Sequence, residues 1–367
     1  MDKTKPIRTR KRISRAGSGG YSIYLPKQWI KGWTEEQSKG KEVEMFTVGD
    51  QLVLSPTLSR RTARTKAGVL SKYELKQYIV SAYVNGADDF ALSSDHLSES
   101  LIGESRNIIR LLDENLVPGS TNNEVSYSNR SDITHDTDAL LTLLFDNVIE
   151  YENIAVDLLG CFDINPRKGV QLLRLMYTLE EEDIDRISFQ LLRQLSRCDP
   201  SSKTLPDLVV KWMTADTLER IGDNLYAIAG LLCGAYGLEK DKLQYPVEYL
   251  QETALKETFS MPRNVEGLKT HAVSDITVSS QMLSRVKDIL LAKDGKAATA
   301  YSNEMNEYRQ RREKEFWGKT GRLPPLSYEA QQCVFLCNMI EARIREIMYL
   351  TEGLAKRAGL MYFAEKA

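Results

Sequence analysis

The chain has 367 residues, of which 42% are hydrophobic and 27% charged, and its formal net charge is −2. This composition is ordinary for a globular protein of two or three domains and excludes wholesale disorder. The longest uncharged apolar stretch, residues 225–238, contains three glycines and is shorter than the roughly 18 residues that a spanning helix needs, so we expect no stable membrane insertion. No apolar segment follows the basic N-terminus, which argues against a secretory signal and predicts a cytoplasmic location.

Cysteine usage agrees with that location. The five cysteines are odd in number and lie mostly within apolar segments that are predicted to be helical, which indicates reduced, buried thiols. Cys333 and Cys337 are four residues apart, but no His or Cys lies near them to complete a zinc site. Core packing is therefore the favoured interpretation of this pair.

Charge is unevenly distributed along the chain. Residues 1–66 contain 15 Lys and Arg against 6 Asp and Glu, whereas the remainder is acidic, with 34 against 45. Such an asymmetry is typical of a protein in which one module meets a polyanion and another has a different role.

The basic head, residues 1–62, has the pattern of a small β module. After a basic arm and the glycine-rich "AGSGG", strands are predicted at 21–25, 41–48 and 51–56, with a helical turn from Pro26 and a turn at Gly49-Asp50. A solvated basic tail is the alternative interpretation of the arm itself. About fifty residues make too small a core to be stable alone, so dimerisation is expected.

The stretch "GGYSIYLPKQWI…KGKEVEMF…GDQLVLSP" with its basic arm resembles the AbrB/SpoVT swapped-hairpin family. That resemblance implies a homodimeric barrel that binds double-stranded DNA. It departs from the family at Lys41, where an Asp often follows the Gly. Basic side chains position a protein on DNA through the phosphates. The side chains expected to do so here are Arg8, Arg10, Lys11, Arg12, Arg15 and Lys27.

Residues 66–130 are predicted to form a small α/β connector. A helix ends at Asn85-Gly86 and is followed by a short strand, a second helix through "LIGESRNIIRLLDENL" and a strand "NEVSYSN". The stretch "VPGSTNNE" is predicted to be an exposed loop.

From residue 131 onward, apolar residues recur in steps of three and four, and this spacing predicts long amphipathic helices. Breakers such as "DINP", "CDPSS", "MPRN" and "GRLPP" separate them. The expected helices are 138–161, 167–197, 203–236, 265–292, 294–317 and 326–358. Six helices divide as three plus three, so the fold class is multidomain and mainly α, with tandem three-helix bundles at 131–240 and 262–367.

One short stretch, "LERIGDN", places Glu219 and Asp223 four residues apart beside the apolar seam. Glu181 and Asp185 repeat that spacing one helix earlier. Four converging carboxylates would repel one another, and a divalent or trivalent cation would relieve the repulsion. Oxygen ligands favour magnesium, calcium or manganese, with iron also possible. In the alternative, the acids are solvated and paired with arginine, as in Glu182 with Arg186 and Asp216 with Arg220.

The sequence segments around these acids resemble the signature helices of the PhoU family. They are "TADTLERIGDNLYAIAGLL" and "LEEEDIDRISFQLLRQL". Members of that family are tandem three-helix bundles that bind metal clusters through E-x-x-x-D motifs and regulate phosphate uptake. The resemblance nominates Glu181, Asp185, Glu219 and Asp223 as metal ligands. With the N-terminal head, the whole chain resembles archaeal-type PhoU regulators.

The second bundle departs from the pattern, because Glu307 is followed by Arg311 and Glu341 by Arg345. A Glu and an Arg four residues apart form an intrahelical ion pair and need no cation. A second metal cluster is therefore expected to be absent or weakened. Alternatively, Arg311 and Arg345 form an anion site.

Together these patterns favour a DNA-binding regulator of phosphate homeostasis over an enzyme. The alternative is an adaptor that dimerises through the head and docks on a phosphate transporter or a signalling partner. A di-iron oxidase would need Glu-x-x-His pairs, which the three histidines do not provide. A phosphate-binding G-x-x-x-x-G-K-[ST] loop is also missing from the sequence.

Overall fold

The computed structural model describes residues 61–95, 97–129, 136–161, 165–198, 205–235, 266–320 and 328–363, together with four strands nearer the N-terminus. The chain divides into two compact units, Met1–Arg61 and Thr62–Ala367. In the first unit, β1 (Ser14–Ala16) pairs with β2 (Gly20–Ser22), and β3 (Val43–Val48) pairs with β4 (Gln51–Pro56), both antiparallel. The strands predicted at 41–48 and 51–56 are thereby confirmed to within two residues.

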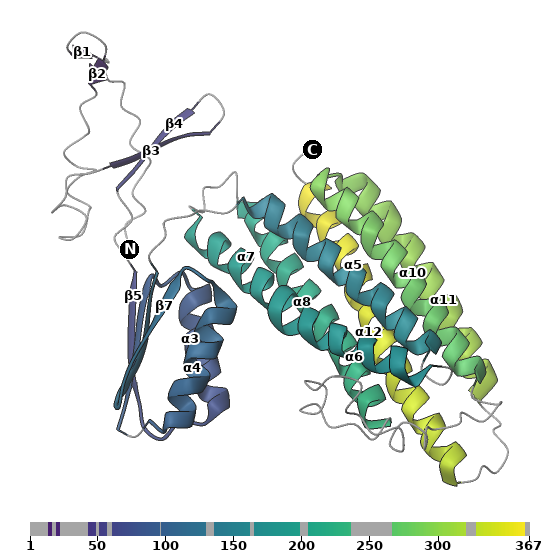
Figure 1. Ribbon diagram of the computed structural model, residues 1–367. Helices are drawn as coiled ribbons and strands as arrows, with labels where there is room; N and C mark the ends of the chain where they lie inside the picture. The colour runs from purple at the N-terminus through teal and green to yellow at the C-terminus, as the bar shows by residue number, and fades with distance from the viewer. Residues whose placement is uncertain are drawn as a thin grey trace. The chain divides into compact units, whose positions relative to one another are not determined.

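The second unit begins with an α/β module in which two helices cover one face of a four-stranded sheet (Figure 1). The helices are α3 (Lys72–Val84) and α4 (Glu99–Leu112). The sheet has the order β5-β6-β8-β7, and its strands are β5 (Thr62–Ala67), β6 (Asp89–Ser94), β7 (Leu116–Thr121) and β8 (Glu124–Asn129). β5 runs parallel to β6, and the other pairs are antiparallel.

Apolar residues explain why this module is compact. Leu75, Ile79 and Tyr83 lie on one side of α3 and are almost completely buried against the sheet, where Phe90 and Tyr127 stack with ring centroids 5.3 Å apart. Ser71 caps α3 and forms a reciprocal capping box with Glu74. The capping box at the start of α3 and the apolar residues along its buried face therefore both favour this helix.

One prediction in this module was wrong. The stretch "VPGSTNNE" was expected to be an exposed loop, but most of it forms β7 and the turn into β8. β7 is an edge strand, where the missing N–H of Pro118 costs no ladder hydrogen bond.

The rest of the second unit is helical. Its helices are α5 (Thr137–Cys161), α6 (Pro166–Thr178), the π-helix η1 (Leu179–Ile184), α7 (Asp185–Arg197), α8 (Leu205–Ala235), α10 (Glu266–Leu291), α11 (Gly295–Thr320) and α12 (Tyr328–Phe363). The predicted helices are confirmed, with ends within five residues of those expected. None of the described helices combines the length and apolar composition that a membrane span requires.

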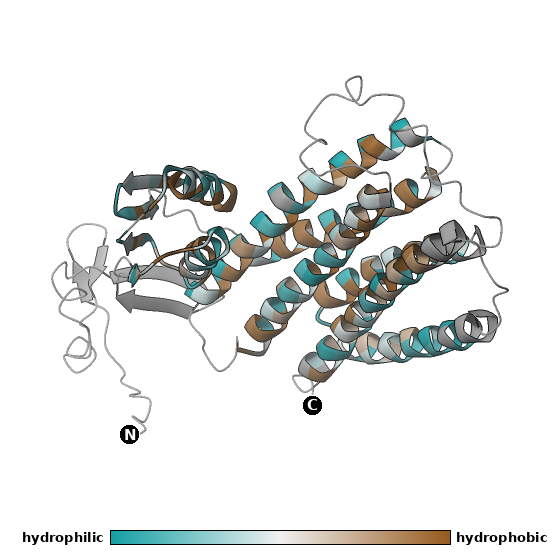
Figure 2. Ribbon diagram, turned by 90° about the horizontal axis from the view of Figure 1, so that it is seen from below, coloured by the Kyte–Doolittle hydropathy of each residue, from teal (hydrophilic) through white to brown (hydrophobic). Residues whose placement is uncertain are grey.

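The helices pack around one core, and we call α5, α6, η1, α7 and α8 the first group and α10, α11 and α12 the second. α5, the continuous α6–η1–α7 rod and α8 contact one another, and α10, α11 and α12 do the same. α5 also packs on α10, and α8 on α12, so one apolar core runs through both groups. Figure 2 shows hydrophobic and hydrophilic residues alternating around each long helix, as expected for helices that bury one face. The described cysteines are thiols rather than disulfides, and Cys161, Cys233 and Cys337 are buried.

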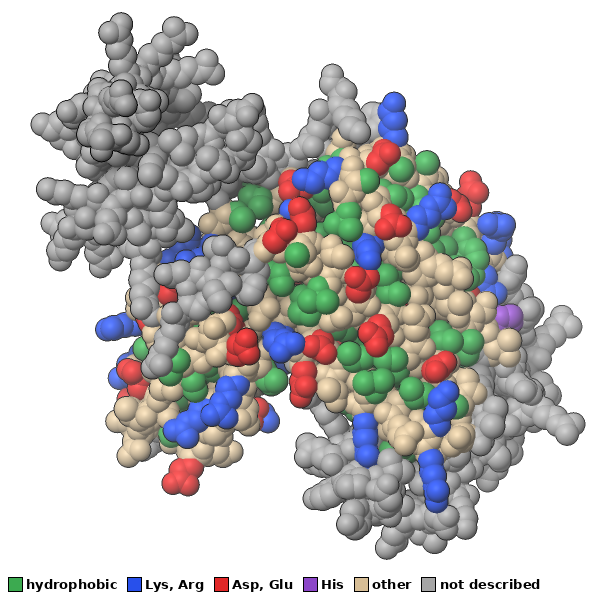
Figure 3. Space-filling view, turned by 45° about the horizontal axis from the view of Figure 1, so that its top comes forward, with side chains coloured by type: hydrophobic (Ala, Val, Ile, Leu, Met, Phe, Trp, Pro, Cys, Tyr) green, Lys and Arg blue, Asp and Glu red, His purple; other side chains and the backbone are tan. Residues whose placement is uncertain are grey.

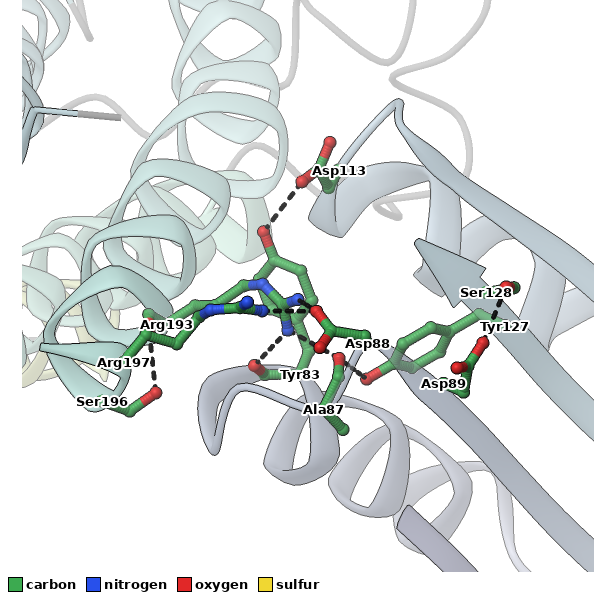
Figure 4. Close-up of polar contacts among 10 residues, drawn as sticks. All are labelled: Tyr83, Ala87, Asp88, Asp89, Asp113, Tyr127, Ser128, Arg193, Ser196 and Arg197. Atoms are coloured by element: carbon green, nitrogen blue, oxygen red, sulfur yellow. Dashed lines mark hydrogen bonds and ion pairs between the residues drawn. The ribbon is translucent and has the colours of Figure 1, made fainter. Parts of the chain in front are cut away.

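A buried arginine joins the α/β module to the helices (Figure 4). The guanidinium of Arg193, on α7, donates to the carbonyl oxygens of Tyr83 (3.0 Å), in the last turn of α3, and of Ala87 (2.7 Å), just beyond it. It also binds the Asp88 carboxylate at 2.9 Å, and Arg197 binds the same carboxylate. This joint fixes α3 against α7.

Candidate cation site

The candidate site lies where the α6–η1–α7 rod packs on α8. On α8, Ala215, Leu218 and Leu225 are completely buried and form the apolar seam. Glu219 is half-buried beside this seam, and Asp223 is exposed at its rim. Burial, with Asp223 and Asp185 as further causes, raises the pKa of Glu219 to about 7. A carboxyl group in this position holds a proton more readily than a solvated one.

The facing acid of the rod is set by its π-helical turn. The backbone N–H of Asp185 donates to the carbonyl oxygen of Glu180, five residues earlier. A π turn accommodates one more residue than an α turn, so the residue that shares a face with Asp185 is Glu180. A regular α-helix would have placed Glu181 there, as the sequence predicted. The side chain of Glu181 lies outside the described residues.

Glu180 is the most deeply buried acid of the site. Its side chain is only 5% exposed, and its Oε2 atom has no hydrogen-bond partner among the described residues. Burial, together with the neighbouring negative charges of Asp185, Asp223 and Glu219, raises the pKa of Glu180 to about 9. An unpaired buried carboxylate is costly, so this oxygen needs a proton or a cation.

A glycine makes room for that carboxylate. A Cβ atom built on Gly222 would lie 2.9 Å from Glu180 Oε2 and 3.1 Å from Ile184 Cγ2. The glycine of "LERIGDN" therefore lets the acid of the neighbouring helix approach the backbone of α8.

The inner wall of the site is aromatic. Tyr151 of α5 is completely buried, and its hydroxyl has no partner within the described part of the chain. Burial and the nearby Glu180 both raise the pKa of this phenol. Tyr177 and Tyr226 pack edge to face with centroids 4.9 Å apart. Both rings also raise the pKa of Tyr151, so they lie near it.

A lysine from the α/β module reaches the outer side of the site. Lys76 Nζ, on α3, lies 3.7 Å from Asp185 Oδ2. Burial raises the pKa of Asp223, and the charges of Lys76 and Arg220 oppose that shift. Lys76 gave no signal in the sequence, because its proximity depends on the packing of α3 against α7.

The predicted arginine pairs that would have neutralised the acids locally are not the ones observed. Arg186 binds Asp183 at 2.8 Å, and Arg220 binds Glu346 of α12 at 3.1 Å. Both arginines therefore have contacts other than the expected Glu182 and Asp216. Figure 3 shows acidic and basic side chains intermixed over the described helical face.

The site's chemistry is that of four carboxylates whose charges oppose one another. Their electrostatic repulsion can be relieved in two ways, by protonation of Glu180 and Glu219 or by the binding of a hard cation to the carboxylate oxygens. As they stand, no three His, Cys, Asp or Glu side chains in the described ranges converge closely enough to hold a metal ion. The orphan oxygen of Glu180 and the all-oxygen donor set nevertheless fit a cation such as magnesium, calcium, manganese or iron.

The second helical group has internal counter-ions instead. Arg345 Nε lies 3.6 Å from Glu341 Oε1, four residues earlier, as the sequence predicted. Arg312 forms two hydrogen bonds to the Asp275 carboxylate, at 2.7 and 2.8 Å. Arg311 is exposed and donates to the backbone oxygen of Glu307 at 3.4 Å. Arg345 and Arg312 therefore balance the charges of Glu341 and Asp275.

The predicted DNA-binding residues lie in the first unit. Arg8, Arg10, Lys11, Arg12 and Lys27 are outside the described residues. Arg15 belongs to β1, paired with Tyr21 of β2, and its side chain is likewise outside the description.

Comparison with known proteins gave no matching family model, no similar curated protein and no similar solved structure.

Proposed function

We propose that this chain is a DNA-binding regulator of phosphate homeostasis whose helical part binds a divalent or trivalent cation. The observation that carries the proposal is the buried, unpartnered Oε2 of Glu180, which faces a group of carboxylates that includes Asp185, Glu219 and Asp223. A cation bound by these residues would neutralise charge that Lys76, at 3.7 Å from Asp185, compensates only in part.

The N-terminal residues supply the proposed DNA contact. Their net positive charge, on a chain that is acidic elsewhere, suits the phosphate backbone of a duplex. The link to phosphate metabolism, the swapped-hairpin dimer and the tandem-bundle architecture rest on the resemblances of the sequence. In this proposal, cation occupancy of the helical part changes the affinity of the head for DNA.

The experiment that tests the proposal measures both activities on the full chain. Metal analysis of the purified protein is expected to find a divalent or trivalent metal, and the Glu219→Ala and Asp223→Ala double variant should lose it. Equal metal content in wild type and variant would remove these residues as ligands.

A gel shift with duplex DNA is the second arm. Binding should weaken steeply with salt and be lost when residues 1–15 are deleted. An adaptor that only dimerises through its head would show weak binding that the deletion leaves unchanged. Adding Mn²⁺ to the wild type then tests whether the two activities are linked.

A further inference from the structure

α3 and α7 lie side by side and run in the same direction. Lys76 contacts Asp185 at one end of this pair of helices, and Tyr83 contacts Arg193 at the other. These contacts are seven residues apart on α3 and eight on α7, or about 10 Å and about 12 Å at 1.5 Å per residue. The module that carries Lys76 is therefore held at a fixed register along the helix that carries Asp185.

The two ends of this interface differ in chemistry. At the Arg193 end, the charges are buried, and Asp88 is shared by two arginines. At the Lys76 end, the lysine side chain is about half-exposed, and its partner Asp185 belongs to the candidate cation site. The first end is a permanent joint, because breaking a buried pair is costly, whereas an exposed contact can be exchanged.

Lys76 already does in part what a bound cation would do. It brings one positive charge to a group of four carboxylates, and this charge opposes the rise that burial causes in the pKa of Asp223. The other nearby cation, Arg220, is bound to Glu346 of α12.

We propose that Lys76 is the resident counter-ion of the cation site and that a bound metal ion competes with it, so that cation binding loosens the N-terminal half of α3 from α7. This inference rests on the proposed cation site and adds its regulation. The α/β module directly follows the N-terminal unit in sequence, so the helix that cation binding would loosen belongs to the part of the second unit that comes first along the chain.

Linkage sets the size of the effect. If the ammonium group and the metal ion repel each other, each weakens the binding of the other by the same factor. Solvent screens a half-exposed lysine, so removing its charge should tighten cation binding by about three- to thirtyfold rather than by orders of magnitude more.

The test is a Mn²⁺ titration of the full chain by calorimetry, for wild type, Lys76→Gln and Lys72→Gln. Lys72 is the matched control, because it lies on the same helix and its Nζ binds Glu104 of the same module at 2.9 Å. Lys76→Gln should bind Mn²⁺ about three- to thirtyfold more tightly, and Lys72→Gln should bind as the wild type does.

A second readout separates competition from a merely structural role. Hydrogen exchange of the α3 amides around Lys76 should quicken when Mn²⁺ is added to the wild type, whereas the amides near Tyr83 should not change. In Lys76→Gln, the amides should exchange faster without metal and respond little to it.

Two results overturn the inference, and they can be told apart. If wild type and Lys76→Gln bind Mn²⁺ with equal affinity, Lys76 is not a competitor, although the cation site stands. If neither protein binds Mn²⁺, the proposed cation site fails together with the inference.

Discussion

The backbone N–H of Asp185 donates to the carbonyl oxygen of Glu180, five residues earlier, within a helix that is otherwise α-helical on both sides. This single π turn decides which acid of "LEEEDID" faces α8. It also explains why Glu180 is buried among the acids of the candidate site.

The register of this turn predicts which residue matters for cation binding. Glu180→Gln should weaken Mn²⁺ binding by at least about tenfold, whereas Glu181→Gln should change it less than about twofold. Calorimetric titration of the two variants beside wild type measures both numbers. Tight binding by Glu180→Gln with loss in Glu181→Gln would mean that the rod keeps an α-helical register in solution.

Gly222 should be hard to replace. A Cβ at this position would lie 2.9 Å from Glu180 Oε2 and 3.1 Å from Ile184 Cγ2, so Gly222→Ala forces these two buried side chains to shift within a packed interface. We expect the free energy of unfolding to fall by about 1–3 kcal/mol in urea denaturation.

Gly230→Ala, in the same helix, is the control for Gly222→Ala. A Cβ at Gly230 would meet only the Tyr177 hydroxyl, at 3.9 Å. This substitution should raise stability by about 0.5–1 kcal/mol, because alanine favours the helix. If both variants gained stability alike, the close approach at Gly222 would not exist.

Stability without metal should decrease as pH rises, and Glu180 should account for part of the decrease. Its pKa in the folded protein, about 9, is above its ordinary value of 4.5, so the folded state binds the proton more tightly than the unfolded state. The resulting stability is fully present below pH 4.5 and is lost as pH rises towards 9. Glu219 and the completely buried Glu152, whose pKa burial raises to about 8, act in the same direction.

The measurement is urea denaturation in EDTA at several pH values for wild type and Glu180→Gln. The variant should lose less stability than the wild type between pH 6 and pH 9, because its side chain cannot ionise. Exposed Glu182→Gln should follow the wild-type curve. Parallel curves for wild type and Glu180→Gln would show that Glu180 titrates normally.

Much of the helical part could be predicted because its signal is local. Apolar residues at steps of three and four fixed the helices, and the breakers between them fixed their ends to within a few residues. The near-seam position of Glu219 followed from the same periodicity.

The rest of the site depends on information that periodicity does not contain. A period of 3.6 residues assumes an unbroken α-helix, so it selected Glu181 and could not reveal the extra residue of the π turn. Lys76 and Asp185 are more than a hundred residues apart, and only packing brings them together. In the α/β module, the Pro118-Gly119 pair has the composition of a turn, yet an edge strand tolerates it.

The joint between the α/β module and α7 should be far more sensitive to mutation than a surface ion pair. Asp88→Asn leaves the buried guanidinium of Arg193 and the neighbouring Arg197 without their shared counter-charge, so we expect a loss of about 3–5 kcal/mol in urea denaturation. Asp95→Asn is the matched control, because its carboxylate is exposed and binds Lys66 at 3.3 Å. That change should cost less than about 1 kcal/mol. A small loss for Asp88→Asn, equal to that of the control, would indicate that the module does not dock through this joint in solution.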